Sequence, residues 1–223
     1  MGMVRLDLVY RASRLRLSRL VRELDAGQLD TEVPACPRWH VRDVAAHLAG
    51  VAHDFATDRL DGSPDPLWTR RHVRERHRLP MAAVLAEWER WAPRVERLLV
   101  GPDARGSLAH DMTQHEADVR AALGLPRLPG EVWHTMLDEL CRTAEPWHDG
   151  ACTLVVNAHG RTWWLGGGAP SAEVDVDGYE LWRAWFGRRS PAQMRAWQWQ
   201  GEPGPFITQL PVFGPRDTDL AEP

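Results

Sequence analysis

Hydrophobic residues recur with the period of an α-helix along the first two thirds of the chain. Apolar positions three and four residues apart form stripes that end at glycine, proline or a polar turn. These stripes predict five helices, over residues 6–24, 41–55, 80–99, 107–123 and 131–145. The polar stretch 58–78 carries no such stripe and is predicted to be a long connection that could cover the mouth of a site. Four amphipathic helices with one long crossover favour a helical bundle, with the fifth helix leading out of it.

From Gly150 onward the pattern changes to strands, tight turns and short helices. The predicted elements are a hairpin (152–157 and 161–165 around Ala158-His159-Gly160), a half-buried strand (172–177), a helix (179–186) and a further helix after Ser190-Pro191. Proline and glycine are frequent after residue 200, so we expect a tail with a loose end.

The two patterns together predict an α+β protein with separate parts. We expect a four-helix bundle over residues 1–147, a small α+β domain over 150–200 and a Pro/Gly-rich tail over 201–223. The junction is predicted near Trp147-His148-Asp149-Gly150.

Composition narrows the function classes. The 223 residues carry a net charge of −4 and give a pI of about 6.2, so no basic field favours a nucleic-acid partner. Charged residues such as Arg5 and Asp7 interrupt the apolar runs at the amino terminus, and no stretch approaches the roughly 18 apolar residues of a membrane span. We therefore expect a cytoplasmic protein without a membrane partner.

Lysine and cysteine usage exclude further classes. All 27 basic residues are arginine, which excludes a lysine Schiff base and a Walker-type phosphate lysine. Cys36, Cys141 and Cys152 are widely spaced and odd in number, so we interpret them as reduced thiols in the core rather than as a disulfide framework.

The most informative segment for chemistry is DMTQHEAD, residues 111–118. Asp111 and His115 stand four apart, so a helix stacks them on one face, close enough to share a cation. His47 lies beside the apolar stripe of the predicted second helix and can point inward. Two imidazoles and one carboxylate would leave an open fourth position, which is the style of a catalytic zinc site. A pair at this spacing also occurs by chance, and His47 alone would equally suit a core or surface position.

Neighbouring residues offer weaker alternatives. His53 falls on a different helical face from His47 and is predicted at the surface or site mouth, and His110 is a substitute only if Asp111 is not a ligand. Asp118, one turn after His115, could orient its second ring nitrogen or serve as an ordinary surface or capping residue. The Gly166-Gly167-Gly168 run lacks a phosphate-binding motif and is predicted to be a flexible loop.

Two motifs resemble a known family. Residues 39–50 (WHVRDVAAHLAG) and 111–124 (DMTQHEADVRAALG) are similar to the mycothiol-dependent maleylpyruvate isomerase family, within the DinB-like bundle superfamily. Residues 177–188 (DGYELWRAWFGR) resemble a stretch of that family's sterol-carrier-like domain. The resemblance implies a DinB-like four-helix bundle followed by a smaller sterol-carrier-like α+β domain.

Carried over residue by residue, the family's zinc triad falls on His47, Asp111 and His115. The well-studied pattern has glutamate where this chain has Asp111, which is one methylene shorter, so the helix must approach the ion more closely or hold it less tightly. His40 stands where threonine usually caps the second helix, which should weaken the cap but not the site.

The resemblance also implies an activity. A divalent metal, with Zn²⁺ as the expected ion, would hold mycothiol as a thiolate that adds to an activated small-molecule substrate, completing an isomerisation or stopping at S-transfer. Arg188 is the motif-matched cation for an anionic substrate. An ordinary arginine at the surface would fit this position equally well. Two other functions stay open, a metal-dependent hydrolase on the same bundle and a non-enzymatic protein that binds a small ligand or a partner with a structural or degenerate metal site.

Overall fold

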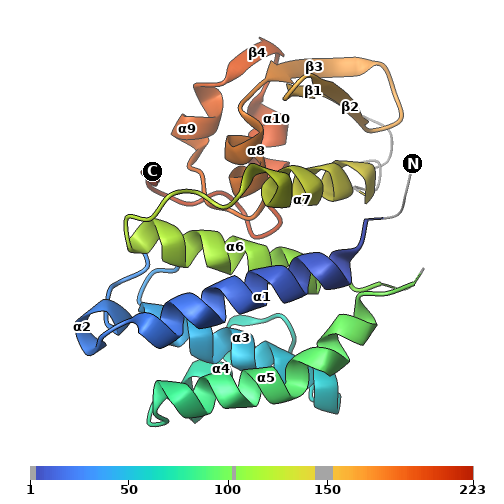
Figure 1. Ribbon diagram of the computed structural model, residues 1–223. Helices are drawn as coiled ribbons and strands as arrows, with labels where there is room; N and C mark the ends of the chain where they lie inside the picture. Colours follow the sequence, from blue (N-terminus) through green and yellow to red (C-terminus); the bar gives the residue numbers. More distant parts are fainter. Residues whose placement is uncertain (1–3, 102–103, 144–152, 223) are drawn as a thin grey trace. The chain divides into compact units, whose positions relative to one another are not determined.

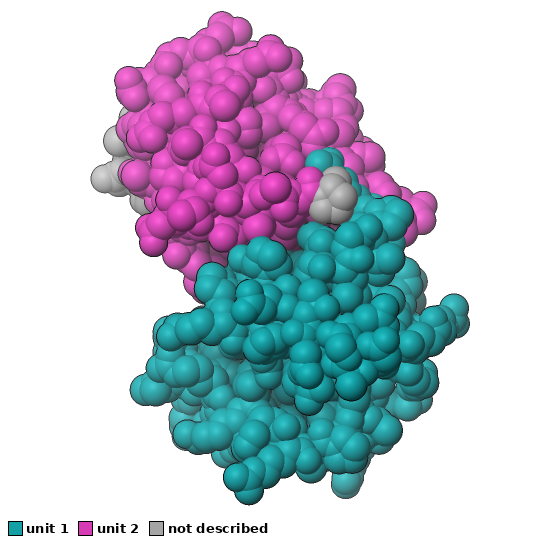
Figure 2. Space-filling model, turned by 90° about the vertical axis from the view of Figure 1, so that its left-hand side faces the viewer, with its two compact units in different colours: residues 1–128, 223 teal, residues 129–222 magenta. Residues whose placement is uncertain are grey.

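The computed structural model describes residues 4–101, 104–143 and 153–222. Two compact units divide the chain, residues 1–128 (with residue 223) and residues 129–222, and Figure 2 colours them separately. The first unit is helical, and the second combines a β-sheet with helices, so the α+β prediction is confirmed. Within the described ranges, no helix is both long and apolar enough to cross a membrane.

Over its described residues, the first unit is built from four long helices and two shorter ones. They are α1 (Leu6–Glu23), α2 (Ala26–Leu29), α3 (Val41–Thr57), α4 (Pro66–Arg76), α5 (Met81–Leu98) and α6 (Ser107–Ala122). Helix α1 packs against α5 and α6, and α3 packs against α4 and α5 (Figure 1). The four long helices match the predicted ranges to within a few residues. Helices α1, α3 and α5 bury an apolar stripe, whereas α6 buries polar residues as well.

Large side chains from the predicted stripes fill the core of the first unit. Trp88 of α5 is fully buried, and its indole nitrogen donates to the Tyr10 hydroxyl of α1 at 3.2 Å. Leu17 and Met112 are among the other largest buried side chains. Each such side chain stabilises the fold by about 1.5–3 kcal/mol through removal of apolar surface from water.

The long connection predicted over 58–78 contains a helix that the sequence pattern did not predict, α4. The Asp65 side chain accepts from the backbone N–H groups of Leu67 and Trp68, and Pro66 occupies the first helical position. An N-cap carboxylate followed by proline starts a helix even where few apolar residues follow. The buried face of α4 carries Trp68 and His72.

At the start of α3, a side chain of the helix itself binds the backbone of His40. The Asp43 carboxylate accepts the backbone N–H of His40 at 2.9 Å. This bond satisfies one of the amide groups exposed at a helix start, where a carboxylate is also favoured by the helix dipole.

The second unit carries α7 (Gly130–Thr143), β1 (Thr153–Ala158), β2 (Arg161–Leu165), β3 (Pro170–Asp175), α8 (Gly178–Trp185), α9 (Pro191–Arg195), β4 (Gln198–Gly201) and α10 (Gly204–Gln209). The strand order is β2-β1-β3-β4; β1 pairs antiparallel with β2 and parallel with β3, which pairs antiparallel with β4. The hairpin, the strand and both helices of the prediction are present, whereas β4 was not predicted. Cys152, at the start of the predicted hairpin, lies outside the described residues.

The predicted fifth helix corresponds to α7, and it packs against α8 within the second unit. Trp133 of α7 contacts the edge of Tyr179 of α8, with ring centroids 5.7 Å apart. The junction predicted at Trp147-His148-Asp149-Gly150 lies outside the described residues, so that boundary stays a prediction.

The prediction of a loose carboxyl-terminal end was wrong. Glu222 is held by the guanidinium groups of Arg183 and Arg189, and Arg189 also pairs with Glu180. The side chains of Arg183, Arg189 and Glu222 are at most 1% exposed. We call these four residues the C-terminal ion network. Because a buried charge without its partner is costly, this network fixes the tail against α8 and the segment that follows it.

Candidate metal centre

The three residues that the sequence predicts as metal ligands lie together in the first unit. His47 extends from the middle of α3, and Asp111 and His115 come from successive turns of α6. The Asp111 Oδ1 atom is 3.6 Å from His47 Nε2 and 3.5 Å from His115 Nε2. One possible ligand atom from each of the three lies within 4.8 Å of the other two.

These separations suit a tetrahedral ion. Ligand atoms about 2.0–2.2 Å from zinc stand about 3.3–3.6 Å apart at tetrahedral angles. The two imidazoles are almost fully buried, with side chains 4% and 9% exposed, whereas the Asp111 side chain is 32% exposed. The donor set therefore fits a divalent cation that stays accessible beside the carboxylate.

The second ring nitrogen of His115 contacts a carboxylate on its own helix. His115 Nδ1 lies 3.0 Å from Asp118 Oδ2, and the Cys36 thiol donates to the same oxygen at 3.3 Å. The sequence allowed two roles for Asp118, orienting His115 or serving as a surface or capping residue. The contact with His115 Nδ1 corresponds to the orienting role. Burial opposes a charge on His115, but Cys36, Asp118 and Asp111 outweigh it and raise the pKa of this histidine to about 10 in the metal-free chain.

The second ring nitrogen of His47 contacts another histidine. His47 Nδ1 lies 3.2 Å from His72 Nδ1, and His72 Nε2 lies 3.1 Å from Asp54 Oδ2. Burial and the neighbouring His47 lower the pKa of His72 to about 4, against the opposing effect of Asp54. Burial would raise the pKa of Asp54, but hydrogen bonds from His53, Arg71 and His72 hold it below its usual range.

Tryptophan rings enclose both histidines. The Trp39 ring lies 5.0 Å from the His47 ring and 6.0 Å from the His115 ring, measured between centroids. Trp68 contacts His72 edge-on at 4.2 Å. These rings pack around the imidazoles and form part of their surroundings.

A second group of possible ligands overlaps the first. Cys36, His115 and Asp118 also offer atoms within 4.8 Å of one another. The two groups share His115, which presents Nε2 to Asp111 and Nδ1 to Asp118. Asp118 accepts from Cys36 and contacts His115 Nδ1. In this position it can support His115 as a ligand of the first group.

The other candidates from the sequence lie in different surroundings. His53 is half-buried, and its Nδ1 lies 2.8 Å from Asp54 Oδ1. His110 is buried on α6. Arg188 is half-buried in the second unit, where its Nη1 donates to the Phe186 carbonyl at 2.7 Å.

Sequence reasoning missed Cys36, Trp39, Asp54 and His72 as parts of this centre. Asp54 stands seven residues after His47, a spacing that returns to the same helical face and could have been noticed. His72 offered a weaker signal, since it depends on α4 forming and docking on α3.

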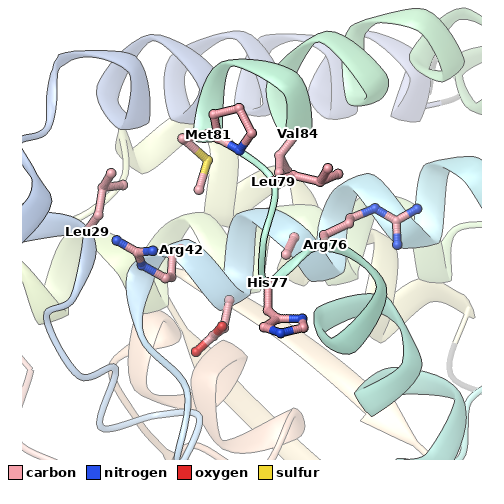
Figure 3. A pocket seen from close by; sticks show the side chains of 10 residues that line it. Leu29, Arg42, Arg76, His77, Leu79, Met81 and Val84 are labelled. Carbon is pink, nitrogen blue, oxygen red and sulfur yellow. The ribbon is translucent and has the colours of Figure 1, made fainter.

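A separate pocket of about 210 Å³ opens in the first unit, and its lining contains none of the three candidate ligands. Figure 3 shows Leu29, Arg42, His77 and Met81 around it. Arg42 pairs with Asp30 at 2.7 Å, so this guanidinium is already engaged with a carboxylate.

Both the sequence and the fold are similar to those of known proteins. The chain matches the family model of the mycothiol maleylpyruvate isomerase N-terminal domain over residues 10–140. A crystal structure of the mycothiol-dependent maleylpyruvate isomerase is similar, with a TM-score of 0.51 and 17% identity, covering 82% of this chain and 88% of that chain. A histidine-to-alanine mutant of that enzyme has a TM-score of 0.47 at the same identity and coverage. No curated protein sequence matches the chain. At this identity the structural likeness shows a shared fold.

Proposed function

The chain belongs to the mycothiol maleylpyruvate isomerase family, and on that premise we propose that it is a metal-dependent enzyme that uses a low-molecular-weight thiol. In this proposal His47, Asp111 and His115 hold one divalent ion, with zinc as the expected metal and mycothiol as the expected thiol. The reaction class is isomerisation of, or thiol transfer to, an activated small molecule.

One observation carries this proposal, the convergence of two buried imidazole nitrogens on a partly exposed carboxylate at 3.5 and 3.6 Å. Imidazole and carboxylate ligands suit zinc, and three protein ligands leave a position for an exogenous group. When bound, the metal would hold a thiol as its thiolate, the nucleophile that adds to a polarised double bond.

The chain's own residues supply positioning. Asp118 fixes the orientation of His115 so that Nε2 points toward Asp111. Trp39 packs beside both imidazoles and contributes to the apolar surroundings of the site. Asp111 provides the one ligand with partial access to solvent, so a thiol would approach from its side of the centre.

Arg188 is proposed as the cation that binds the substrate's carboxylate. Its planar guanidinium matches a carboxylate in two-point hydrogen bonding. It is carried by the second unit, directly before Arg189 of the C-terminal ion network. The test of this role is Arg188→Lys, which keeps the charge and loses the fork, so KM for an anionic substrate should rise while metal content is unchanged.

Elemental analysis tests the metal. Purified wild-type protein should carry about one zinc per chain, and a His47→Ala/His115→Ala double variant should retain none. His134→Ala is the control, because it removes an exposed histidine of the second unit. Equal metal in wild type and double variant would overturn the site.

Cobalt substitution tests the thiol. Mycothiol added to the cobalt-loaded protein should produce a thiolate-to-metal charge-transfer band, and the apparent affinity should rise with pH while the free thiol is still protonated. If neither mycothiol nor a simpler thiol changes the spectrum, the thiol proposal is wrong and hydrolysis by a metal-bound water becomes the better reading.

A further inference from the structure

One face of α3 carries a line of three residues that point toward α4. His47, Gly50 and Asp54 are spaced by three and then four positions, so they lie one above another on the helix. His47 and Asp54 are buried, at 4% and 0% exposure. Helix α4 packs on this face of α3 and places His72 between the two side chains.

Gly50 makes room for that placement. A Cβ atom at position 50 would lie 2.4 Å from Cγ of His72 and 2.6 Å from its Cβ and Cδ2. Real Cβ atoms do not approach so closely, so any larger residue would force the His72 ring away. The glycine is therefore what allows an imidazole to reach His47 and Asp54 together.

The hydrogen bonds have one direction that is consistent with a metal on His47. A ligating Nε2 must present its lone pair, so the proton of His47 is on Nδ1. His47 Nδ1 then donates to His72 Nδ1, and His72 Nε2 donates to Asp54 Oδ2. Asp54 accepts also from Arg71, so the carboxylate at the end of the chain stays ionised.

The opposite arrangement does not satisfy the same groups. If His47 carried its proton on Nε2, His72 would have to donate from Nδ1, and its Nε2 would then face the Asp54 carboxylate without a proton. Two acceptors in contact inside a buried site are unfavourable. The buried pair thus selects the ligating tautomer of His47 before any ion arrives.

We propose that His72 and Asp54 are positioning residues that hold His47 in the tautomer and orientation required of a metal ligand. The proposal rests on the proposed function, since it assumes that His47 binds the ion. Metal-ligating histidines usually donate their second nitrogen directly to a carboxylate or carbonyl. Here a second imidazole stands between the ligand and its carboxylate.

Three variants separate hydrogen bonding from packing. His72→Phe keeps a ring but removes the acceptor and the donor, whereas His72→Gln keeps one of each. Asp54→Asn removes the charge at the end of the chain. Glu96→Gln is the matched control, because it neutralises a buried carboxylate that pairs with Arg11 and Arg14 elsewhere in the same unit.

The first measurement is the zinc dissociation constant of the whole chain, obtained by competition with a chromophoric chelator, with circular dichroism as the check on folding. His72→Phe and Asp54→Asn should each weaken zinc binding by about 10- to 100-fold. His72→Gln should restore part of the loss, and Glu96→Gln should bind as wild type.

The second measurement is ¹⁵N NMR of the histidine rings in the metal-free protein. Wild type should show His47 with its proton on Nδ1, and His72→Phe should show a mixture of tautomers. A purely structural role for His72 would leave this signature unchanged.

The outcomes distinguish the two proposals. If wild type binds zinc, His115→Ala does not, and folded His72→Phe and Asp54→Asn bind as wild type, the positioning role is wrong and the metal site stands. If wild type and His115→Ala bind zinc equally, or neither binds it, the proposed metal site fails and the positioning role fails with it.

Discussion

The two histidines of the candidate metal centre are supported in different ways. His115 is supported by Asp118, which stands three residues later on the same helix. His47 is supported by His72 and Asp54, which requires α4 to dock on α3 across Gly50. One support depends on the geometry of a single helix, and the other depends on tertiary packing. The second is therefore the support that a change far from the ligands can disturb.

If the two supports are independent, their losses should multiply. Asp118→Asn and Asp54→Asn should each weaken zinc binding by about 10- to 100-fold, so the double variant should lose on the order of 100- to 10,000-fold. Chelator competition on all four proteins measures this cycle. A double variant no weaker than the worse single variant would show that the two supports act as one unit.

A substitution at Gly50 should break only the tertiary support. Gly50→Ala should destabilise the protein by about 1–3 kcal/mol, because its Cβ overlaps the His72 ring. In a His72→Ala background the same substitution should cost much less than it does in the wild type, as measured by urea unfolding. Gly167→Ala is the control, since its Cβ would meet no atom within 4 Å. Equal effects at positions 50 and 167 would contradict the steric explanation.

In the metal-free protein, the stability contributions of His72 and His115 should depend on pH in opposite directions. The pKa of His72 falls from 6.5 to about 4, so the unfolded chain binds a proton that the folded chain does not, and stability declines as pH falls from about 6.5 toward 4. The pKa of His115 rises from 6.5 to about 10, so stability declines as pH rises from about 6.5 toward 10.

Urea unfolding at a series of pH values tests this expectation. His72→Gln should flatten the acid limb of the stability curve, and His115→Gln should flatten the alkaline limb. Curves that keep both limbs in both variants would show that other groups set the pH dependence.

Thiol labelling should have the smallest effect on zinc binding, and it should affect only the surroundings of His115. Burial raises the pKa of Cys141 to about 12, with a smaller contribution from Asp138, so its reactive thiolate is scarce. Cys36 is half-buried beside Asp118 and His115. In a Cys152→Ser background, a thiol reagent should modify Cys36 first and slow zinc uptake. Faster labelling of Cys141, followed by mass spectrometry, would contradict this order.

The same contrast explains what the sequence could predict. Asp111, His115 and Asp118 lie on one helix, so their relation follows from helical spacing alone. His47 could be added because its motif resembles a family pattern. His72 could not, because the stretch around it has too few apolar residues for a helical stripe. Its start signal, Asp65-Pro66, is the same kind of signal that Ser190-Pro191 gave for α9. The closure of the tail depended on ion pairs between residues far apart in the chain, which no local pattern reveals.

The C-terminal ion network has a consequence for the thermodynamics of ligand capture. Arg189 is pinned by Glu180 and Glu222, and the adjacent Arg188 therefore starts from a backbone that has little freedom left to lose. Binding an anion at Arg188 would therefore cost less conformational entropy than binding it at an arginine on a free loop. The tail thus holds the backbone that carries the guanidinium proposed to bind the substrate, although none of the tail's residues needs to contact that substrate.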